Sequence, residues 1–123
     1  MKDYPKISDA EWKVMEILWQ KSPMSSTEII SALKDSTDWN PKTIHTLISR
    51  LVKKGAVGIK KGNNINEYFP LIEETPYKNL ETESFLHKVY NGSIKLLVSN
   101  FIKDDKLSPE EIKELKNILE DKE

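Results

Sequence analysis

The sequence predicts a mainly α-helical protein with one small β-hairpin, because two kinds of apolar pattern alternate along its 123 residues. Apolar residues recur at helical spacing in the first part of the chain, alternate with other residues between Ala56 and Leu71, and return to helical spacing afterwards. A polar break around Pro76 separates the last part. We therefore expect one domain over residues 1–72 and a helical domain over residues 73–123.

The composition excludes several classes of function. The chain has no cysteine, which excludes disulfides, thiolate metal sites and cysteine nucleophiles. No apolar run approaches the roughly 20 residues of a membrane span, and the amino terminus lacks the apolar core of a signal peptide. We expect a cytoplasmic protein without membrane insertion, metal or cofactor.

The first two helices are predicted by capping boxes. Ser8 with Glu11, and Ser25 with Glu28, have the spacing at which two residues cap a helix start reciprocally. Both tryptophans of the first helix are interpreted as packing residues rather than as a ligand-stacking surface. The start of the second helix is open to two interpretations, because Ser25 and Ser26 would serve either as plain capping residues or as backbone contacts to a phosphate.

A third helix is predicted from Asn40, its N-cap, through Pro41 in its first turn, to Gly55 at a left-handed C-cap. One face is apolar and predicted to be buried: Ile44, Leu47, Ile48 and Leu51. The opposite face has no acidic residue and consists of Lys42, Thr46, Ser49 and Lys53, flanked by His45 and Arg50. Such a face suits an approach to phosphates and base edges.

Charge is distributed unevenly along the chain. Residues 39–66 hold six Lys or Arg and no acid, whereas residues 1–38 and 67–123 each hold more acids than bases. A basic segment between acidic flanks indicates a local site for a polyanion.

A β-hairpin is predicted after the third helix, with strands over Ala56–Lys60 and Glu67–Leu71 around the tip residues 62–66. Lys60 and Lys61 stand where the tip begins. Lysines also protect isolated edge strands from pairing, but beside a basic helix we favour a nucleic-acid contact.

The order of three helices and a basic hairpin is that of a winged helix-turn-helix, in which the third helix enters the major groove and the hairpin wing contacts the DNA backbone. We therefore expect double-stranded DNA as the partner. The candidates for base-edge or groove contacts are Lys42, Thr43, His45 and Thr46. The candidates for phosphate contacts are Arg50, Lys53, Lys60, Lys61 and Tyr68.

The second half is predicted to hold one long helix between about Lys78 and Lys103 and a last helix that begins after Ser108. A last helix of about a dozen residues is marginal alone, so its apolar face needs a partner, for which we favour a second subunit. The predicted dimerisation residues are Leu86, Tyr90, Ile94, Leu97, Phe101, Ile112, Leu115 and Leu119. Gly92 indicates either close helix approach or a local break.

Several segments in matching order resemble one family across nearly the whole chain. They include Pro41-Lys42-Thr43-Ile44, Thr46-Leu47-Ile48 and Lys53-Lys54-Gly55 in the third helix, with Lys88-Val89-Tyr90 and Asn100-Phe101 in the second half. This succession is similar to the penicillinase and methicillin-resistance repressors, the BlaI/MecI family.

The resemblance implies a homodimeric repressor that binds a pseudo-palindromic operator of β-lactam-resistance-type genes. It also implies that a membrane sensor-transducer pathway leads to cleavage between an Asn and a Phe that match Asn100 and Phe101. From the residues alone, Phe101 is a core residue and Asn100 its polar neighbour. His45 departs from the family pattern, which more often has Arg or Lys at this position, so a cationic contact there becomes conditional on pH.

Three other functions are alternatives to DNA binding: an enzyme, a metal sensor and a protein-interaction module. An enzyme has little support, because the only histidines, His45 and His87, have no thiol or glycine-rich phosphate loop beside them. His87 is interpreted as a surface or dimer-edge residue. A metal sensor is also disfavoured, because the copper-responsive relatives of these repressors use paired cysteines, which this chain lacks. The alternative function is a winged-helix protein-interaction module whose basic face binds an acidic partner.

Overall fold

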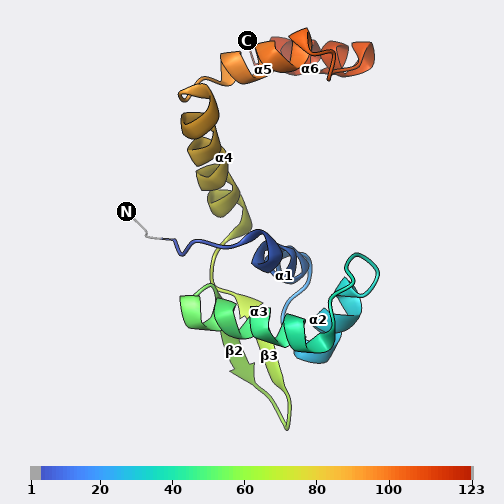
Figure 1. The fold of residues 1–123 in the computed structure, drawn as a ribbon, viewed down its shortest axis with the longest axis vertical. Coiled ribbons are helices and arrows are strands. Elements are labelled where there is room, and N and C mark those ends of the chain that lie inside the picture. The colour runs from blue at the N-terminus through green and yellow to red at the C-terminus, as the bar shows by residue number, and fades with distance from the viewer. Residues whose placement is uncertain (1–3, 123) are drawn as a thin grey trace. The chain divides into compact units, whose positions relative to one another are not determined.

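The computed structural model describes residues 4–122, which form mainly helices and a small antiparallel sheet (Figure 1). The predicted fold class is therefore confirmed. The elements are α1 (Asp9–Gln20), β1 (Met24–Ser25), α2 (Ser26–Leu33), α3 (Pro41–Lys54), β2 (Val57–Lys61), β3 (Asn66–Pro70), α4 (Glu74–Tyr90), α5 (Ile94–Lys103) and α6 (Pro109–Asp121). The chain divides into two compact units, and the boundary lies between Tyr77 and Lys78, within α4.

The sheet of the first unit has the order β1-β3-β2, with β3 in the centre and both pairings antiparallel. Tyr68 of β3 lies opposite Met24 on one side and Ile59 on the other. The two hairpin strands begin and end within one residue of their predicted bounds. The sequence did not predict β1, because a two-residue strand is too short to show an alternating pattern.

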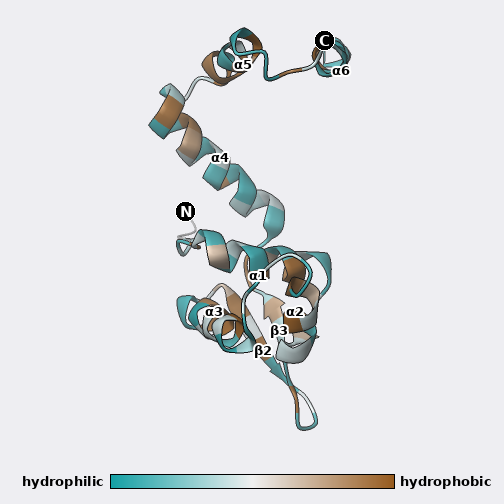
Figure 2. Ribbon diagram, turned by 45° about the vertical axis from the view of Figure 1, so that its right-hand side comes forward, coloured by the Kyte–Doolittle hydropathy of each residue, from teal (hydrophilic) through white to brown (hydrophobic). Residues whose placement is uncertain are grey.

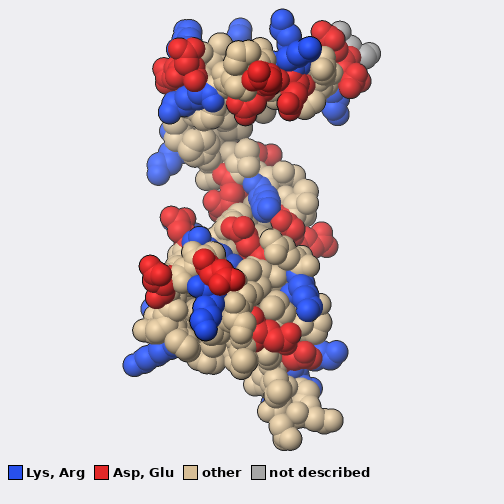
Figure 3. Space-filling model, turned by 90° about the vertical axis from the view of Figure 1, so that its right-hand side faces the viewer, with Lys and Arg blue, Asp and Glu red and all other residues tan. Residues whose placement is uncertain are grey.

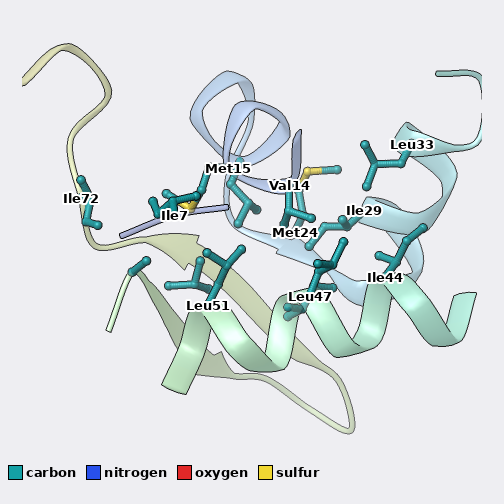
Figure 4. Close-up of a cluster of buried hydrophobic side chains, with 14 of the residues drawn as sticks. Ile7, Val14, Met15, Met24, Ile29, Leu33, Ile44, Leu47, Leu51 and Ile72 are labelled. Atoms are coloured by element: carbon teal, nitrogen blue, oxygen red, sulfur yellow. The ribbon is translucent and has the colours of Figure 1, made fainter. Parts of the chain in front are cut away.

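The core of the first unit lies between its three helices and the sheet (Figure 4). Helix α3 packs against α1 and β2. Trp12 and Trp19 pack on this core, with their ring centroids 5.6 Å apart in an edge-to-face arrangement. The indole N–H of Trp19 also donates to the backbone oxygen of Ile72 at 2.8 Å. These contacts confirm the interpretation of the tryptophans as packing residues.

Tyr77, in the first turns of α4, is only 1% exposed. Its hydroxyl donates to the backbone oxygen of Pro5 at 3.1 Å and accepts from the N–H of Ile7 at 3.2 Å. Its ring packs edge-to-face on Tyr4 and also against Trp12. The sequence alone predicted Tyr77 to lie in the helical half, and nothing local revealed its core position, because its partners Tyr4, Pro5, Ile7 and Trp12 lie more than 60 residues earlier in the chain.

The prediction of one helix from Lys78 to Lys103 was wrong. Helix α4 ends at Tyr90 and α5 begins at Ile94. Between them Asn91 and Gly92 adopt positive φ angles of 52° and 83°, and the N–H of Gly92 donates to the backbone oxygen of Leu86 at 2.8 Å. A glycine tolerates this left-handed geometry without steric strain. Of the two interpretations of Gly92, the local break is therefore correct.

The second unit has almost no core of its own. Of its described residues, only Leu86 is buried; Figure 2 shows hydrophobic positions along α4 and α5, and several of these side chains are exposed, among them Phe85 and Ile94. The helices themselves are well formed. Ser108 caps α6 in a capping box with Glu111, and Ser93 caps α5. Their apolar faces are therefore present but uncovered in the single chain.

Candidate nucleic-acid interface

Helix α3 begins and ends as the sequence predicts. The side-chain oxygen of Asn40 accepts from the N–H of Thr43 at 2.9 Å, and Pro41 occupies the first turn. Gly55 ends the helix with a φ of 81°, and its N–H donates to the backbone oxygen of Val52 at 3.0 Å. Both ends are thus closed by local bonds, which holds the helix as one rigid element.

One face of α3 anchors it in the core, and the other is open. Ile44, Leu47 and Leu51 point toward α1 and α2 in Figure 4. The opposite face surrounds a shallow depression of about 310 Å³. It is lined by Lys42, His45, Thr46, Ser49, Arg50 and Lys53, and Thr43 is exposed beside it. The structure thus brings together on one surface all the DNA-contact candidates predicted on this helix, which we call the reading face.

The hydroxyl of Thr46 has a restricted role on this face. It donates to the backbone oxygen of Lys42 at 3.0 Å, so its proton is already used within the helix. The oxygen keeps its capacity to accept, and the methyl group is exposed with the rest of the side chain. Thr46 therefore suits an adenine or cytosine amino group, or a thymine methyl group, in the major groove.

Lys54 does not belong to the reading face. Its ammonium donates to Glu11 Oε1 at 2.5 Å and to the backbone oxygen of Lys6 at 2.9 Å. Glu11 is 2% exposed and also accepts from the N–H of Ser8 at 2.8 Å. Burial acts to raise the pKa of Glu11, but the bonds from Lys54 and Ser8 outweigh it, so the pKa lies below its ordinary value. The basic segment therefore offers DNA one cation fewer than its composition indicates.

The two wing lysines have different surroundings. Lys60 lies opposite Glu67 across the hairpin, and Lys61 lies opposite the uncharged Asn66. Residue Glu67 is also paired with Ser25 of β1. Residues 39–66 contain no acidic residue, but Glu67 follows directly after them. The hairpin register places Glu67 opposite Lys60. A prediction of the hairpin register would have revealed this pair.

Tyr68 is half-buried and packs against the core rather than standing free on the wing. It lines a groove of about 510 Å³ between the start of α2 and the wing tip. Ser25 forms the predicted capping box there, since its N–H donates to Glu28 Oε1 at 3.0 Å and its hydroxyl accepts from the N–H of Glu28 at 3.2 Å. The N–H and hydroxyl of Ser25 hold the pKa of Glu28 below its ordinary value. A phosphate contact by Ser25 or Ser26 remains a prediction.

Between residues 4 and 122, no cluster of three His, Cys, Asp or Glu side chains could hold a metal ion. Within that range, none of the helices has the length and apolar character needed to cross a membrane.

The chain is similar to known proteins of one family over nearly its whole length. Residues 7–121 match the sequence description of the penicillinase repressor family. The chain is 47% identical over 117 residues to the methicillin resistance regulatory protein MecI of Mammaliicoccus sciuri, covering 95% of each chain. It is 44% identical over 121 residues to the penicillinase repressor of Bacillus licheniformis, covering 98% of this chain and 94% of the relative.

A solved structure resembles part of the chain. The Bacillus licheniformis BlaI monomer in complex with the blaP half-operator is 43% identical, with a TM-score of 0.55, and the match covers 63% of this chain and 94% of the other. This similarity confirms the winged-helix architecture.

Proposed function

The chain belongs to the penicillinase repressor family, and on this premise we propose that it represses transcription as a homodimer bound to a pseudo-palindromic operator. The family is one of transcriptional repressors rather than enzymes. The relatives' names include methicillin resistance and penicillinase, so genes of β-lactam resistance are the regulated class that we propose.

The observation that carries this proposal is the reading face of α3. It is free of acidic side chains, it is exposed, and it is supported from behind by four buried residues of the same helix. A rigid helix with such a surface suits the major groove, where a helix fits and base edges are distinguishable. A similar chain, BlaI of Bacillus licheniformis, was solved with the blaP half-operator.

We divide the contacts by their chemistry. Lys42, Thr43, His45 and Thr46 are assigned to base edges or the nearby groove, because they lie toward the amino-terminal half of α3. The side chains assigned to phosphates are those of Arg50, Lys53, Lys60, Lys61 and Tyr68. The ring of Tyr68 packs against the core, so Tyr68 would contact a phosphate only from the side that lines the groove beside α2.

The test is footprinting across the upstream region of the chain's own gene, with the blaP half-operator as a second probe. We expect a protected, sequence-specific site whose affinity falls with salt. Lys60→Ala should weaken operator and random DNA about equally and reduce the salt slope by roughly one, whereas Thr46→Ala should change sequence preference. Salt-dependent retention without a specific footprint would support the alternative of a basic surface for an acidic protein.

Dimerisation is proposed for residues 73–123, with DNA binding in residues 1–72. Helices α5 and α6 have no buried residue, and most of the large apolar side chains on them are more than a third exposed, with Leu97 and Ile112 half-buried. A second copy supplies an identical set of apolar faces, and two-fold pairing places two reading faces on one operator. The proposed contacts are Tyr90, Ile94, Leu97, Phe101, Ile112, Leu115 and Leu119, together with Leu86, which unlike the others is already buried in the single chain.

Relief of repression is proposed to occur by cleavage between Asn100 and Phe101, through a membrane sensor-transducer pathway. The support is the resemblance to the family at these two residues, both of which are exposed in the single chain. Cleavage there would remove Phe101 and all of α6 from the dimer. The test is a chain that ends at Asn100, which should keep half-site binding and lose dimerisation.

A further inference from the structure

The break between α4 and α5 contains a pair of residues that occurs once in the chain. Asn91 is the only asparagine of the sequence that a glycine follows. The side-chain amide of an asparagine is open to attack by the backbone nitrogen of the next residue, and a glycine there leaves the approach unobstructed because it has no side chain. Asparagine is accordingly one of the residues that limit the chemical lifetime of proteins. Asn91 is therefore a candidate for a spontaneous covalent modification.

The structure leaves this pair accessible. Asn91 and Gly92 are exposed, lie between two helices and both have positive φ angles. The other asparagines of the second unit lie inside helices, where the backbone is held by successive hydrogen bonds: Asn79, Asn100 and Asn117. The N–H of Gly92 is held only by its bond to the backbone oxygen of Leu86 at 2.8 Å. This bond lies at the end of α4, and bonds at fraying ends open more readily than those in a core.

The imidazole of His87 packs against Gly92. A Cβ atom added at Gly92 would lie 3.3 Å from Cε1 and 3.4 Å from Nδ1 of this ring. A neutral imidazole has one nitrogen that accepts a proton, and histidine is the side chain that most often serves as a general base. The structure thus holds a base beside the residue whose nitrogen would attack Asn91.

We propose that Asn91 deamidates in the folded chain, with His87 as the general base. The backbone nitrogen of Gly92 forms a bond to Cγ of Asn91, and His87 takes the proton of that nitrogen. His87 returns the proton to the side-chain nitrogen of Asn91, which leaves as ammonia. A water molecule then opens the cyclic imide at one of its two carbonyl carbons, which gives aspartate or isoaspartate.

Either product should weaken the dimer. Both add a carboxylate just after the last turn of α4, where the helix dipole disfavours a negative charge. Isoaspartate also lengthens the backbone by one atom at the connection to α5. Among the described residues of the second unit only Leu86 is buried, so this unit has little packing of its own to resist the change. The effect on the dimer rests on the proposed dimerisation, whereas the modification itself does not.

Peptide mapping by mass spectrometry, after incubation of the unaltered chain at neutral pH, tests the modification. Conversion at Asn91 should be at least about tenfold faster than at the other asparagines. His87→Gln should slow it about tenfold or more in the folded chain, as expected for loss of a general base, and leave it unchanged in the urea-unfolded chain. No conversion at Asn91 in the folded chain would overturn the proposal.

Amide hydrogen exchange at Gly92 separates a general base from a merely structural role of His87. The exchange rate should be the same in the unaltered chain and in His87→Gln, because the bond from Gly92 to Leu86 opens equally in both. A change in exchange that matches the change in deamidation would overturn the assignment of His87 as the base. Equal deamidation rates for the two folded proteins would also overturn that assignment.

Analytical ultracentrifugation tests the effect on the dimer. Asn91→Asp should weaken dimerisation about threefold or more, because the dipole effect acts in both chains. Asn79→Asp is the matched control and should dimerise as the unaltered chain does, since it adds the same charge to an exposed position near the start of α4. Figure 3 shows acidic and basic side chains mixed on the visible face of α4, α5 and α6, so this surface already holds both charges.

Asn91→Gly removes the reactive amide and keeps a residue that accepts the φ of 52°. It should retain its dimer affinity through an incubation in which the unaltered chain loses affinity. Equal affinities of the incubated and the fresh unaltered chain, with Asn91 converted, would overturn the effect on the dimer. A fresh chain that is monomeric would overturn the proposed dimerisation and leave the mass-spectrometric result for Asn91 intact.

Discussion

The ammonium of Lys54 and the buried carboxylate of Glu11 join the last turn of α3 to the first turn of α1. Glu11 Oε1 also accepts from the N–H of Ser8, so one oxygen both completes the capping box of α1 and binds α3. A buried carboxylate is costly unless it is paired and hydrogen-bonded. The pair therefore orients the end of α3, and its disruption leaves a buried charge that water reaches poorly.

Replacing Lys54 by methionine should lower the free energy of unfolding by about 2 kcal/mol, because Glu11 would lose its cationic partner while staying buried. The measurement is urea unfolding followed by tryptophan fluorescence. Lys53→Met is the control, since Lys53 is exposed and carries the same charge one residue away. Equal stability of the two variants would show that the pair contributes no net free energy.

Stability should also depend on pH through Glu11. Its pKa in the folded chain lies below the ordinary value of 4.5, so the folded state favours the charged carboxylate. This contribution is complete above about pH 4.5, declines as the pH falls toward the lower pKa of the folded state, and is absent below it. Urea unfolding of the unaltered chain and of Glu11→Gln between pH 7 and pH 3 measures it. The difference between the two unfolding free energies should narrow with acid; a difference independent of pH would contradict this expectation.

Tyr77→Phe should reduce the unfolding free energy by about 1–2 kcal/mol, because it leaves the ring in place and removes the hydroxyl that bonds Pro5 and Ile7. Tyr4→Phe is the control in the same aromatic cluster, since Tyr4 contacts Tyr77 through its ring and is only half-buried. Chemical denaturation of the two variants tests the comparison. A larger loss for Tyr4→Phe would argue against the anchoring role of the Tyr77 hydroxyl.

Two glycines should respond differently to alanine. Gly55→Ala should cost about 1 kcal/mol through its φ of 81° alone, because no atom lies within 4 Å of the added Cβ. Gly55→Asn should cost less, since asparagine tolerates this conformation. At Gly58 the added Cβ would lie 2.6 Å from the ring of Phe69, so the cost there is steric. Thermal unfolding should show that Phe69→Leu offsets part of the cost of Gly58→Ala and none of that of Gly55→Ala.

Local signals made most of the first unit predictable. The caps at Ser8, Ser25 and Asn40 are complete within four residues of sequence, and the apolar period of α3 identifies its buried face. The Lys54–Glu11 pair and the core position of Tyr77 were missed, because they join residues more than 40 positions apart. The break at Asn91 and Gly92 was left open rather than predicted, because the apolar stripe continues across it in the sequence although the backbone turns.

The apolar faces of α5 and α6 are uncovered in the single chain. Leu119 is 67% exposed in the single chain, so Leu119→Lys should leave each chain folded but weaken the dimer. Asn117→Lys adds the same charge away from the apolar positions of α6 and is the matched control. Analytical ultracentrifugation should show dissociation of Leu119→Lys at concentrations where Asn117→Lys stays dimeric.

The affinity for DNA should differ between Leu119→Lys and Asn117→Lys in the same way as their dimerisation. On a half-site all three proteins should bind equally, because the reading face lies in the other unit. On a full operator, loss of the second reading helix should weaken Leu119→Lys by about 10² to 10⁴, since bivalent binding makes the second contact intramolecular. Equal half-site and full-site affinities for the unaltered chain would show that dimerisation contributes nothing to binding. A weaker half-site affinity for Leu119→Lys would instead place residue 119 in direct support of the DNA-binding unit.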